Sequence, residues 1–181
     1  QEGSKYMEID LNKTLLTTCS LLDHVKKHQI KEFIFASSSA IYGPQDTTLD
    51  EAFGQHHPIS YYGAAKLASE AFINACHEQT SFKSWTFRFP NVVGPYMTHG
   101  VLHDFINKLQ KDPSTLEILG DGNQKKPYTH VNDLVNGILH GWKHSQNDSN
   151  IFNLGVTDQT TVTEIASLTV KAMTLSNVTF T

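Results

Sequence analysis

Phe33-Ile34-Phe35-Ala36-Ser37-Ser38-Ser39 is the stretch that decides the fold. Its first four residues form a short, nearly all-apolar run, which is typical of a parallel strand covered on both faces. Small polar residues follow at once, and such residues at the carboxyl end of a parallel strand suit a ligand crevice. The stretch therefore predicts a buried strand with a candidate site where the strand ends.

Helices and strands are predicted to alternate on both sides of this strand. Apolar residues recur at helical spacing over 8–28, which predicts an amphipathic helix that breaks at Gln29-Ile30. A loop over 43–58 precedes a predicted helix over 62–78. The other predicted elements are strands at 85–89, 116–119 and 151–154, helices at 102–109, 130–142 and 162–173, and a turn at 121–123. Such steady alternation predicts one folded unit of the α/β class with a mostly parallel sheet.

Composition narrows the class of protein. The chain has 181 residues, 39% of them hydrophobic and 18% charged, which is enough for one globular core. A formal charge of -4, with Arg88 as the single arginine, argues against a nucleic-acid partner. No apolar run approaches the roughly 20 residues that span a bilayer, so we expect no membrane association and a cytoplasmic protein. Cys19 and Cys76 lie in predicted helices rather than in a disulfide framework, which fits a reducing compartment.

The ten histidines raise the question of a metal site. Pairs at i, i+4 spacing could clamp zinc in principle, and they are His24 with His28, His99 with His103, and His140 with His144. Each pair lacks an obvious third ligand, and no His-Glu-x-x-His motif occurs. Chance spacing on solvated helix faces explains the pairs better, so we predict no metal.

Tyr62 and Lys66 lie one helical turn apart in Tyr62-Gly63-Ala64-Ala65-Lys66. Their side chains should share a helix face, with Cβ atoms about 5 to 6 Å apart. A tyrosine with an ordinary pKa near 10 is a poor base at neutral pH, but a nearby ammonium favours the phenolate. Tyr62 could then take a proton from a hydroxyl, with a serine of the preceding run sharing that proton. Taken alone, however, the pair can be a surface helix pair, and the serines can be turn formers or helix caps.

Five ordered motifs set these residues in a wider pattern, at 33–43, 62–66, 88–95, 120–122 and 128–134. Together they resemble the extended short-chain dehydrogenase/reductase family, in particular its NAD-dependent nucleotide-sugar epimerases and dehydratases of the UDP-glucose 4-epimerase type. The resemblance implies a partial Rossmann-like, doubly wound parallel sheet with part of a small C-terminal substrate-binding region. Residues 1–95 would form the C-terminal part of the NAD-binding domain with the Ser/Tyr/Lys site. Residues 96–181 would form the substrate-binding region, interleaved with the last Rossmann elements.

The resemblance also implies roles for single residues. Ser38, Tyr62 and Lys66 would be catalytic, with Tyr62 as the base and Lys66 lowering its pKa and holding the nicotinamide ribose. The residues expected to bind NAD are Ser37, Tyr62, Lys66, Phe89 and Pro90, and those expected to bind the substrate are Ser38, Ser39, Asn91 and Lys126. A lone asparagine after a strand is otherwise a turn residue. Lys126 stands where the family has an arginine, which keeps the charge but loses the bidentate fork.

The implied activity is that of an NAD-dependent 4-epimerase, an isomerase of carbohydrate metabolism that acts on a UDP-hexose through transient oxidation at C4. Dehydratases and decarboxylating members of the family carry an acidic residue where this chain has Ser39-Ala40, which favours epimerisation. A dehydratase or reductase of the same family remains an alternative. The resemblance further implies a homodimer through a four-helix bundle of the helices around Leu15 and Ala68.

A glycine-rich phosphate turn of the Gly-x-Gly-x-x-Gly kind does not occur in the sequence. The resemblance implies that the chain is cut off before that turn and before its usual end, so we expect it to bind no dinucleotide tightly by itself. A truncated, non-catalytic module that binds nucleotide sugars is therefore the second alternative.

Overall fold

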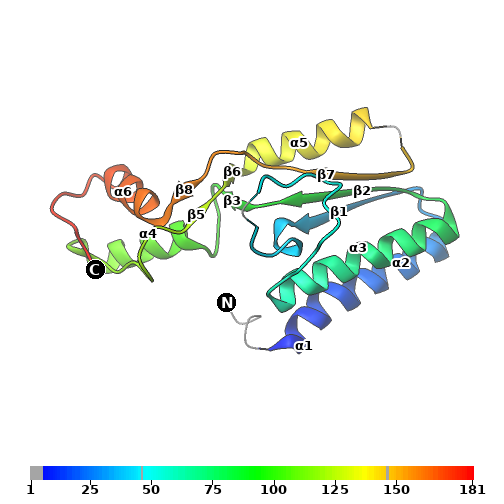
Figure 1. The fold of residues 1–181 in the computed structure, drawn as a ribbon, viewed down its shortest axis with the longest axis horizontal. Coiled ribbons are helices and arrows are strands. Elements are labelled where there is room, and N and C mark those ends of the chain that lie inside the picture. The colour runs from blue at the N-terminus through cyan, green and yellow to red at the C-terminus, as the bar shows by residue number, and fades with distance from the viewer. Residues whose placement is uncertain (1–5, 46, 146) are drawn as a thin grey trace. The chain divides into compact units, whose positions relative to one another are not determined.

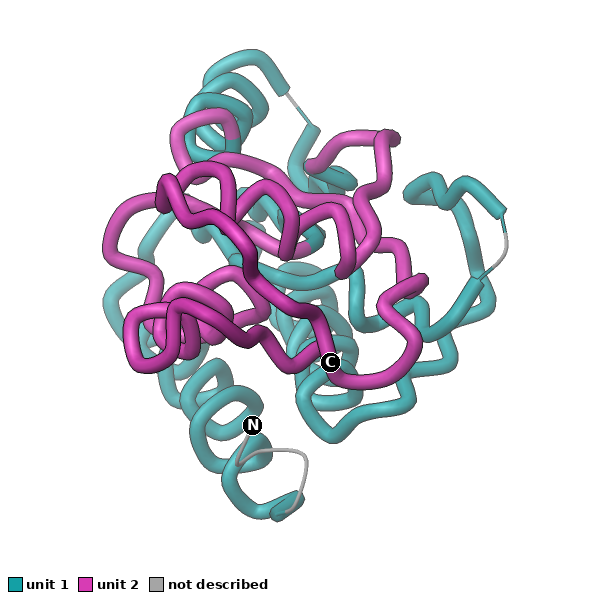
Figure 2. Tube along the Cα trace, turned by 90° about the vertical axis from the view of Figure 1, so that its left-hand side faces the viewer, with its two compact units in different colours: residues 1–90, 134–154 teal, residues 91–133, 155–181 magenta. Residues whose placement is uncertain are grey.

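The computed structural model describes residues 6–45, 47–145 and 147–181. It divides into two compact units, which Figure 2 colours separately: unit 1 comprises residues 1–90 and 134–154, and unit 2 comprises residues 91–133 and 155–181. The chain therefore leaves unit 1, forms part of unit 2, and returns to complete unit 1 before it ends in unit 2. Each unit has a hydrophobic cluster of its own.

Unit 1 contains a three-stranded parallel sheet in the order β1-β2-β7. Its elements are α1 (Met7–Asp10), the π-helical η2 (Leu11–Leu16), α2 (Thr17–His28), β1 (Glu32–Ser38), the 3-10 helix η3 (Ser39–Ile41), α3 (Tyr61–Thr80), β2 (Lys83–Phe89), β7 (Ser149–Asn153) and most of α5 (Val131–His144). The register sets Ser37 opposite Arg88 and Arg88 opposite Asn153. The predicted α/β class with a parallel sheet is confirmed.

Helices cover both faces of this sheet, with α2 and α3 on one side and α5 on the other (Figure 1). On the first side, alternate side chains of β1 pack with the helices in one buried cluster, made of Leu22, Val25, Phe35, Ile73, Cys76 and Phe82. On the second side, Phe87 stacks on Phe152 with 5.4 Å between ring centroids. A Cβ atom at Gly141 would lie 2.9 Å from Phe87, so the glycine lets α5 approach the strands closely. The layers explain why the central strand β2 is buried on both faces over Ser84 to Arg88.

The helix predicted over 8–28 is confirmed as a helical run from α1 through η2 to α2. It ends at Gln29, whose φ of 52° is left-handed, as is common where a helix terminates. The π-helical turn over Leu11–Leu16 was not predicted, because its residues keep the apolar spacing of an ordinary helix. The loop predicted over 43–58 contains no helix or strand among its described residues, and position 46 lies outside them.

Unit 2 consists of two helices and several very short strands among the described residues. The elements are β3 (Asn91–Val93), α4 (Val101–Lys111), β4 (Thr115–Leu116), β5 (Lys125–Lys126), β6 (Tyr128–His130), β8 (Thr160–Thr161), α6 (Val162–Ala172) and β9 (Thr179–Phe180). They pair as β3-β6, β4-β9 and β5-β8. The strand predicted over 116–119 is wrong in extent, because only Thr115–Leu116 pair with β9. The helices α4 and α6 enclose the core residues Phe105, Leu109, Leu116 and Ala166.

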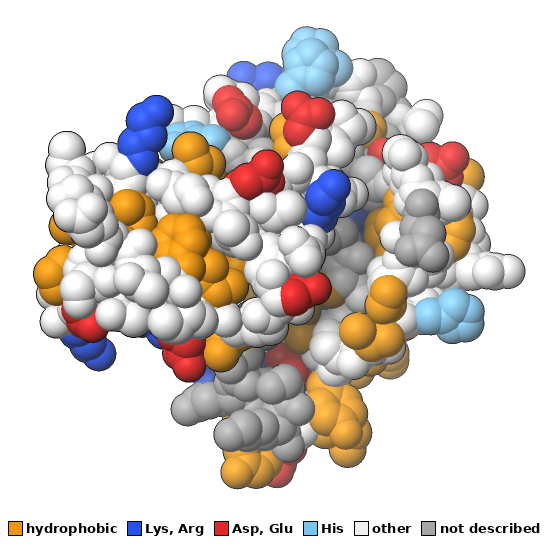
Figure 3. Space-filling model, turned by 60° about the vertical axis from the view of Figure 1, so that its left-hand side comes forward, with side chains coloured by type: hydrophobic (Ala, Val, Ile, Leu, Met, Phe, Trp, Pro, Cys, Tyr) orange, Lys and Arg blue, Asp and Glu red, His pale blue; other side chains and the backbone are white. Residues whose placement is uncertain are grey.

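The surface carries charges of both signs. On the face in Figure 3, Lys and Arg side chains are interspersed with Asp and Glu rather than gathered into one basic patch. Within the part of the chain that the structure describes, no helix has both the length and the apolar character of a membrane span. The same described residues contain no group of three or more His, Cys, Asp or Glu side chains placed to hold a metal ion.

Candidate active site

Ser38, Tyr62 and Lys66 come together at the carboxyl end of β1. Tyr62 lies in the first turn of α3, where the Ser60 side chain caps the helix by accepting a hydrogen bond from Gly63 N at 3.1 Å. Lys66 lies one turn further on, with its Nζ 5.8 Å from the centroid of the Tyr62 ring. Ser38 Oγ accepts a hydrogen bond from Ala40 N at 3.2 Å, and the interaction of its side chain with Tyr62 lowers the pKa of that phenol. The predicted grouping of a hydroxyl, a phenol and an ammonium is therefore present in unit 1.

Tyr62 is a protonated phenol at neutral pH in this structure. Burial raises its pKa above the ordinary value of 10.0; the interaction with Ser38 lowers the pKa, and the charge of Asp10 raises it further. The residue as a whole is nevertheless 41% exposed. Lys66 is not among the groups that shift the Tyr62 pKa here, because its ammonium hydrogen-bonds the backbone of β1.

Lys66 Nζ donates a hydrogen bond to the carbonyl oxygen of Ala36 at 2.7 Å and lies 4.8 Å above the Phe35 ring. Burial lowers the pKa of Lys66, and the negative charge of Glu70 raises it, with a net lowering. A four-carbon stem allows the ammonium to leave the carbonyl for a nearby ligand hydroxyl. The position of Lys66 is thus compatible with a hydroxyl-rich ligand at this end of the strand.

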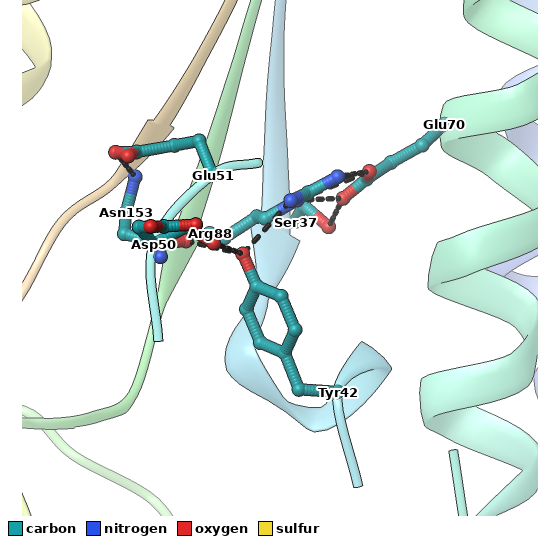
Figure 4. Close-up of polar contacts among 7 residues, drawn as sticks. All are labelled: Ser37, Tyr42, Asp50, Glu51, Glu70, Arg88 and Asn153. Carbon is teal, nitrogen blue, oxygen red and sulfur yellow. Dashed lines mark hydrogen bonds and ion pairs between the residues drawn. The ribbon is translucent and has the colours of Figure 1, made fainter. Parts of the chain in front are cut away.

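Figure 4 shows a buried ion pair that the sequence analysis did not predict, between Arg88 of β2 and Glu70, which lies one helical turn after Lys66 in α3. Arg88 and Glu70 are 5% and 9% exposed, and Arg88 Nη2 lies 2.7 Å from Glu70 Oε2. Ser37 is only 1% exposed, and its hydroxyl donates a hydrogen bond to Glu70 Oε1. Arg88 Nη1 donates to the Tyr42 hydroxyl at 2.8 Å, which in turn donates to Asn153 Oδ1 at 2.7 Å. The network joins β1, β2, β7 and α3.

Two signals in the sequence could have revealed this network. Arg88 is the only arginine and stands in an apolar strand, where a charge requires a buried partner. Glu70 continues the four-residue spacing of Tyr62 and Lys66, which places it on the same face of α3. Burial lowers the pKa of Arg88, but its contacts with Glu70 and Tyr42 raise that pKa, and the net direction is upward. The arginine therefore stays charged inside the protein.

The loop after η3 packs on this network through Tyr42. The His56 ring stacks on the Tyr42 ring with 5.3 Å between centroids. His56 Nε2 is buried and has no hydrogen-bond partner among the described residues. Burial lowers the pKa of His56, and the positive charge of Arg88 lowers it further. His56 is therefore neutral at neutral pH.

The other predicted site residues are divided between the two compact units. Ser39 begins η3, while Phe89 and Pro90 are half-buried at the end of β2, all in unit 1. Asn91 and Lys126 belong to unit 2, where Asn91 Nδ2 donates to the carbonyl oxygen of Pro127 at 3.3 Å. Lys126 precedes that proline and is exposed in β5. The structure thus brings Asn91 and the backbone beside Lys126 together within unit 2.

A parallel sheet covered on both faces, with polar side chains at the carboxyl end of one strand, is the arrangement in which Rossmann-type folds bind their ligands. The chain belongs to the NAD dependent epimerase/dehydratase family, whose model matches residues 2–155. It is therefore a member of an enzyme family that uses NAD.

Individual relatives include both epimerases and dehydratases. The chain is 33% identical over 167 residues to a Methanocaldococcus jannaschii protein provisionally named a UDP-glucose 4-epimerase, covering 86% of this chain and 51% of that protein. It is 28% identical over 148 residues to human dTDP-D-glucose 4,6-dehydratase, covering 81% of this chain and 41% of the relative. The chain thus spans about half the length of the curated relatives it matches.

Solved structures of epimerases are similar over nearly the whole chain. A crystal structure of UDP-galactose 4-epimerase matches with a TM-score of 0.89 and 30% identity, covering 97% of this chain and 58% of that one. The Thermotoga maritima UDP-glucose 4-epimerase with UDP-glucose matches with a TM-score of 0.86 and 26% identity, covering 99% and 59%. The predicted Rossmann-like fold is therefore confirmed.

Proposed function

We propose that the protein is an NAD-dependent nucleotide-sugar 4-epimerase that acts on a UDP-hexose. The observation that carries the proposal is the grouping of Ser38, Tyr62 and Lys66 at one strand end, in a chain that belongs to this family. The names of the relatives and similar structures above add UDP-sugars as the substrate class.

The residues at this strand end fit a nicotinamide nucleoside. The Lys66 ammonium and the Tyr62 phenol can donate hydrogen bonds to ribose hydroxyls, because both groups lie on one face of α3. Phe89 and Pro90 offer a partly apolar surface at the end of the next strand. Ser37 would contact the cofactor through its backbone, since its hydroxyl is engaged by Glu70. When bound, NAD would accept the C4 hydrogen of the sugar and later return it.

Tyr62 would act as the base that takes the proton of the C4 hydroxyl. Since burial raises its pKa, Lys66 must leave Ala36 and approach the phenol before Tyr62 can work as a base at neutral pH. Ser38 would donate a hydrogen bond to the reacting oxygen and stabilise the charge that develops there. The proton would return from Tyr62 to the C4 oxygen while the C4 hydrogen is delivered to the opposite face of the 4-keto sugar.

Asn91 and Lys126 would bind the diphosphate so that the hexose can turn while the nucleotide stays fixed. Lys126 would act as a single point charge, because a lysine cannot form the two parallel hydrogen bonds of an arginine. Ser39 would contact the sugar beside Ser38. We assign the NAD side of the site to residues 1–95, and the substrate-binding region to residues 96–181, interleaved with the last Rossmann elements, which lie within 134–154.

We also propose a homodimer that buries the layer of helices bearing Leu15 and Ala68. Large apolar side chains are exposed on these helices, with Leu16 at 49%, Leu21 at 51% and Phe72 at 52%. A monomer in sedimentation would contradict this assembly.

A reducing, cytoplasmic environment fits the two free cysteines, of which Cys76 is buried.

The test is conversion of UDP-glucose to its C4 epimer by the protein with NAD, followed by NMR of the product. We expect the epimer to accumulate with no net change in cofactor absorbance at 340 nm. Tyr62→Phe should abolish turnover while the circular dichroism spectrum stays unchanged. Turnover retained by that variant would refute the assigned role of Tyr62.

The second candidate is a dehydratase or reductase of the same family, which the human dehydratase relative favours. A dehydratase would yield a 4-keto product, and a reductase would consume cofactor in proportion to product. Calorimetric titration with NAD and with UDP-glucose separates both enzymes from a non-catalytic remnant. Binding of UDP-glucose without any conversion would favour the remnant.

A further inference from the structure

Consecutive residues of β1 are tied to successive turns of α3. Tyr62, Lys66 and Glu70 are four residues apart, so their side chains lie along one face of the helix. Three residues of β1 meet them: the carbonyl oxygen of Ala36 accepts from Lys66 at 2.7 Å, the Ser37 hydroxyl donates to Glu70, and the Ser38 side chain interacts with Tyr62 and lowers its pKa. The position of α3 along β1 therefore decides whether the groups of the proposed site meet.

Of the three side chains on this face of α3, that of Glu70 is held by the most hydrogen bonds. Both of its carboxylate oxygens accept from Arg88 Nε at 3.2 Å, and Oε2 also accepts from Arg88 Nη2 at 2.7 Å. Ser37 supplies a further hydrogen bond to Oε1. A carboxylate that is 9% exposed and held by two partners cannot change rotamer without leaving the Arg88 charge unpaired.

Tyr62 and Lys66 are held less firmly. Tyr62 is 41% exposed, and Lys66 Nζ has one hydrogen bond, to a backbone carbonyl, among the described residues. The groups that face Lys66 are the Phe35 ring and the Ala36 carbonyl from β1, and Tyr62 and Glu70 from its own helix. Glu70 is the only charged group among them.

We propose, resting on the proposed 4-epimerase function, that Glu70 is a positioning residue: by joining α3 to Arg88 and Ser37, it sets Tyr62 and Lys66 opposite Ser38. Its charge has a second effect one helical turn away. Because burial lowers the pKa of Lys66 and Glu70 raises it, Glu70 helps to keep the lysine as the ammonium that the proposed reaction requires.

The test variant is Glu70→Gln, which keeps the shape of the side chain and removes its charge. The Lys66 ammonium is titrated by NMR on 13C-dimethylated protein without substrate, with Lys66→Arg used to assign the signal. We expect the pKa of Lys66 to be lower in the variant than in the natural sequence. An unchanged Lys66 pKa would overturn the proposal, because a purely structural role of Glu70 would leave it unmoved.

Glu117→Gln is the matched control, since Glu117 pairs with Lys108 at 2.8 Å on the surface of unit 2. It removes the same charge and should leave the Lys66 signal unchanged. Glu70→Asp serves where Glu70→Gln does not fold, because it withdraws the carboxylate by one methylene. Because Glu70→Asp keeps the charge, its readout is kcat, and an unchanged kcat in that variant overturns the positioning role.

Turnover gives the second readout. Displacing catalytic groups by about 1 Å can cost about 100-fold in rate, so kcat should fall by about 10- to 100-fold in Glu70→Gln. KM for the UDP-sugar should change little, since the proposed diphosphate contacts lie in unit 2. An unchanged kcat would overturn the positioning role. If the natural sequence shows no 4-epimerase activity, the proposed function fails, while the Lys66 titration still decides the role of Glu70.

Discussion

Replacing Arg88 by methionine should be among the most damaging changes in unit 1. The substitution keeps an unbranched side chain of similar reach, but it leaves Glu70, 9% exposed, as a buried carboxylate without its cation. The Tyr42 hydroxyl also loses the donor that lies 2.8 Å away. Removing one partner of a buried pair typically costs about 3 to 5 kcal/mol. Stabilities of domains are about 5 to 15 kcal/mol, so a large share of the total would be lost.

The assay is urea unfolding followed by tryptophan fluorescence, because Trp85 and Trp142 both lie in unit 1. With a slope of about 2 kcal/mol per molar urea, the midpoint should fall by about 2 M. Adding Glu70→Leu to Arg88→Met should recover much of this loss, since apolar groups replace buried ion pairs well. Lys108→Met, in the exposed pair with Glu117, is the control and should move the midpoint little. A loss below about 1 kcal/mol for Arg88→Met, typical of an exposed pair, would refute the reasoning.

Four further substitutions, of which Leu119→Ala is a control, test other parts of the structure. Asp10→Asn should lower the pKa of Tyr62 in NMR of 13C-labelled tyrosine, because the Asp10 charge raises that pKa, and an unchanged value would contradict the assignment. His56→Phe should reduce the stability lost between pH 7.5 and 5.5. The folded pKa of His56 is lowered, so its contribution is complete above the unfolded pKa of 6.5 and declines as the pH falls below it. Equal losses in both proteins would count against this. Leu109→Ala, at a side chain 1% exposed, should cost about 2 to 5 kcal/mol in urea unfolding. Leu119→Ala, at 75% exposure, should stay within about 0.5 kcal/mol, and similar losses in both variants would contradict the assigned core.

The long elements were predictable because their signals are local. The helix expected over 62–78 is α3 (Tyr61–Thr80), and the strand expected over 85–89 is β2 (Lys83–Phe89). In each case the apolar spacing within the segment was enough. The family motifs then indicated which side chains to compare, and Ser38, Tyr62 and Lys66 do meet in the structure.

The short strands were not predictable because their partners are distant in the sequence. β4 at Thr115–Leu116 pairs with β9 at Thr179–Phe180, and two residues give no periodicity to detect. The strand expected over 116–119 was too long for the same reason, since its length is set by the partner strand. The pairing of Lys125–Lys126 with Thr160–Thr161 likewise depends on tertiary packing.

The electrostatics of the site also depended on the folded structure. Spacing places Glu70 on the same face of α3 as Tyr62 and Lys66, and the packing of α3 on β2 then identifies Arg88 as its partner. The protonation of the Tyr62 phenol is set mainly by burial, which disfavours the phenolate. Spacing alone suggested that Lys66 would favour the phenolate. Burial of a polar group is a tertiary property that a helix pattern does not record.

The most direct test of the proposed function uses UDP-glucose that carries deuterium at C4, incubated with the protein and NAD. Because the same hydrogen should leave C4 and return to it within one catalytic cycle, we predict that the C4 epimer retains the deuterium and that the cofactor is unchanged at the end. A 4-epimer that has lost the label to solvent, or a keto product that accumulates as cofactor is reduced, would contradict epimerisation through transient oxidation at C4.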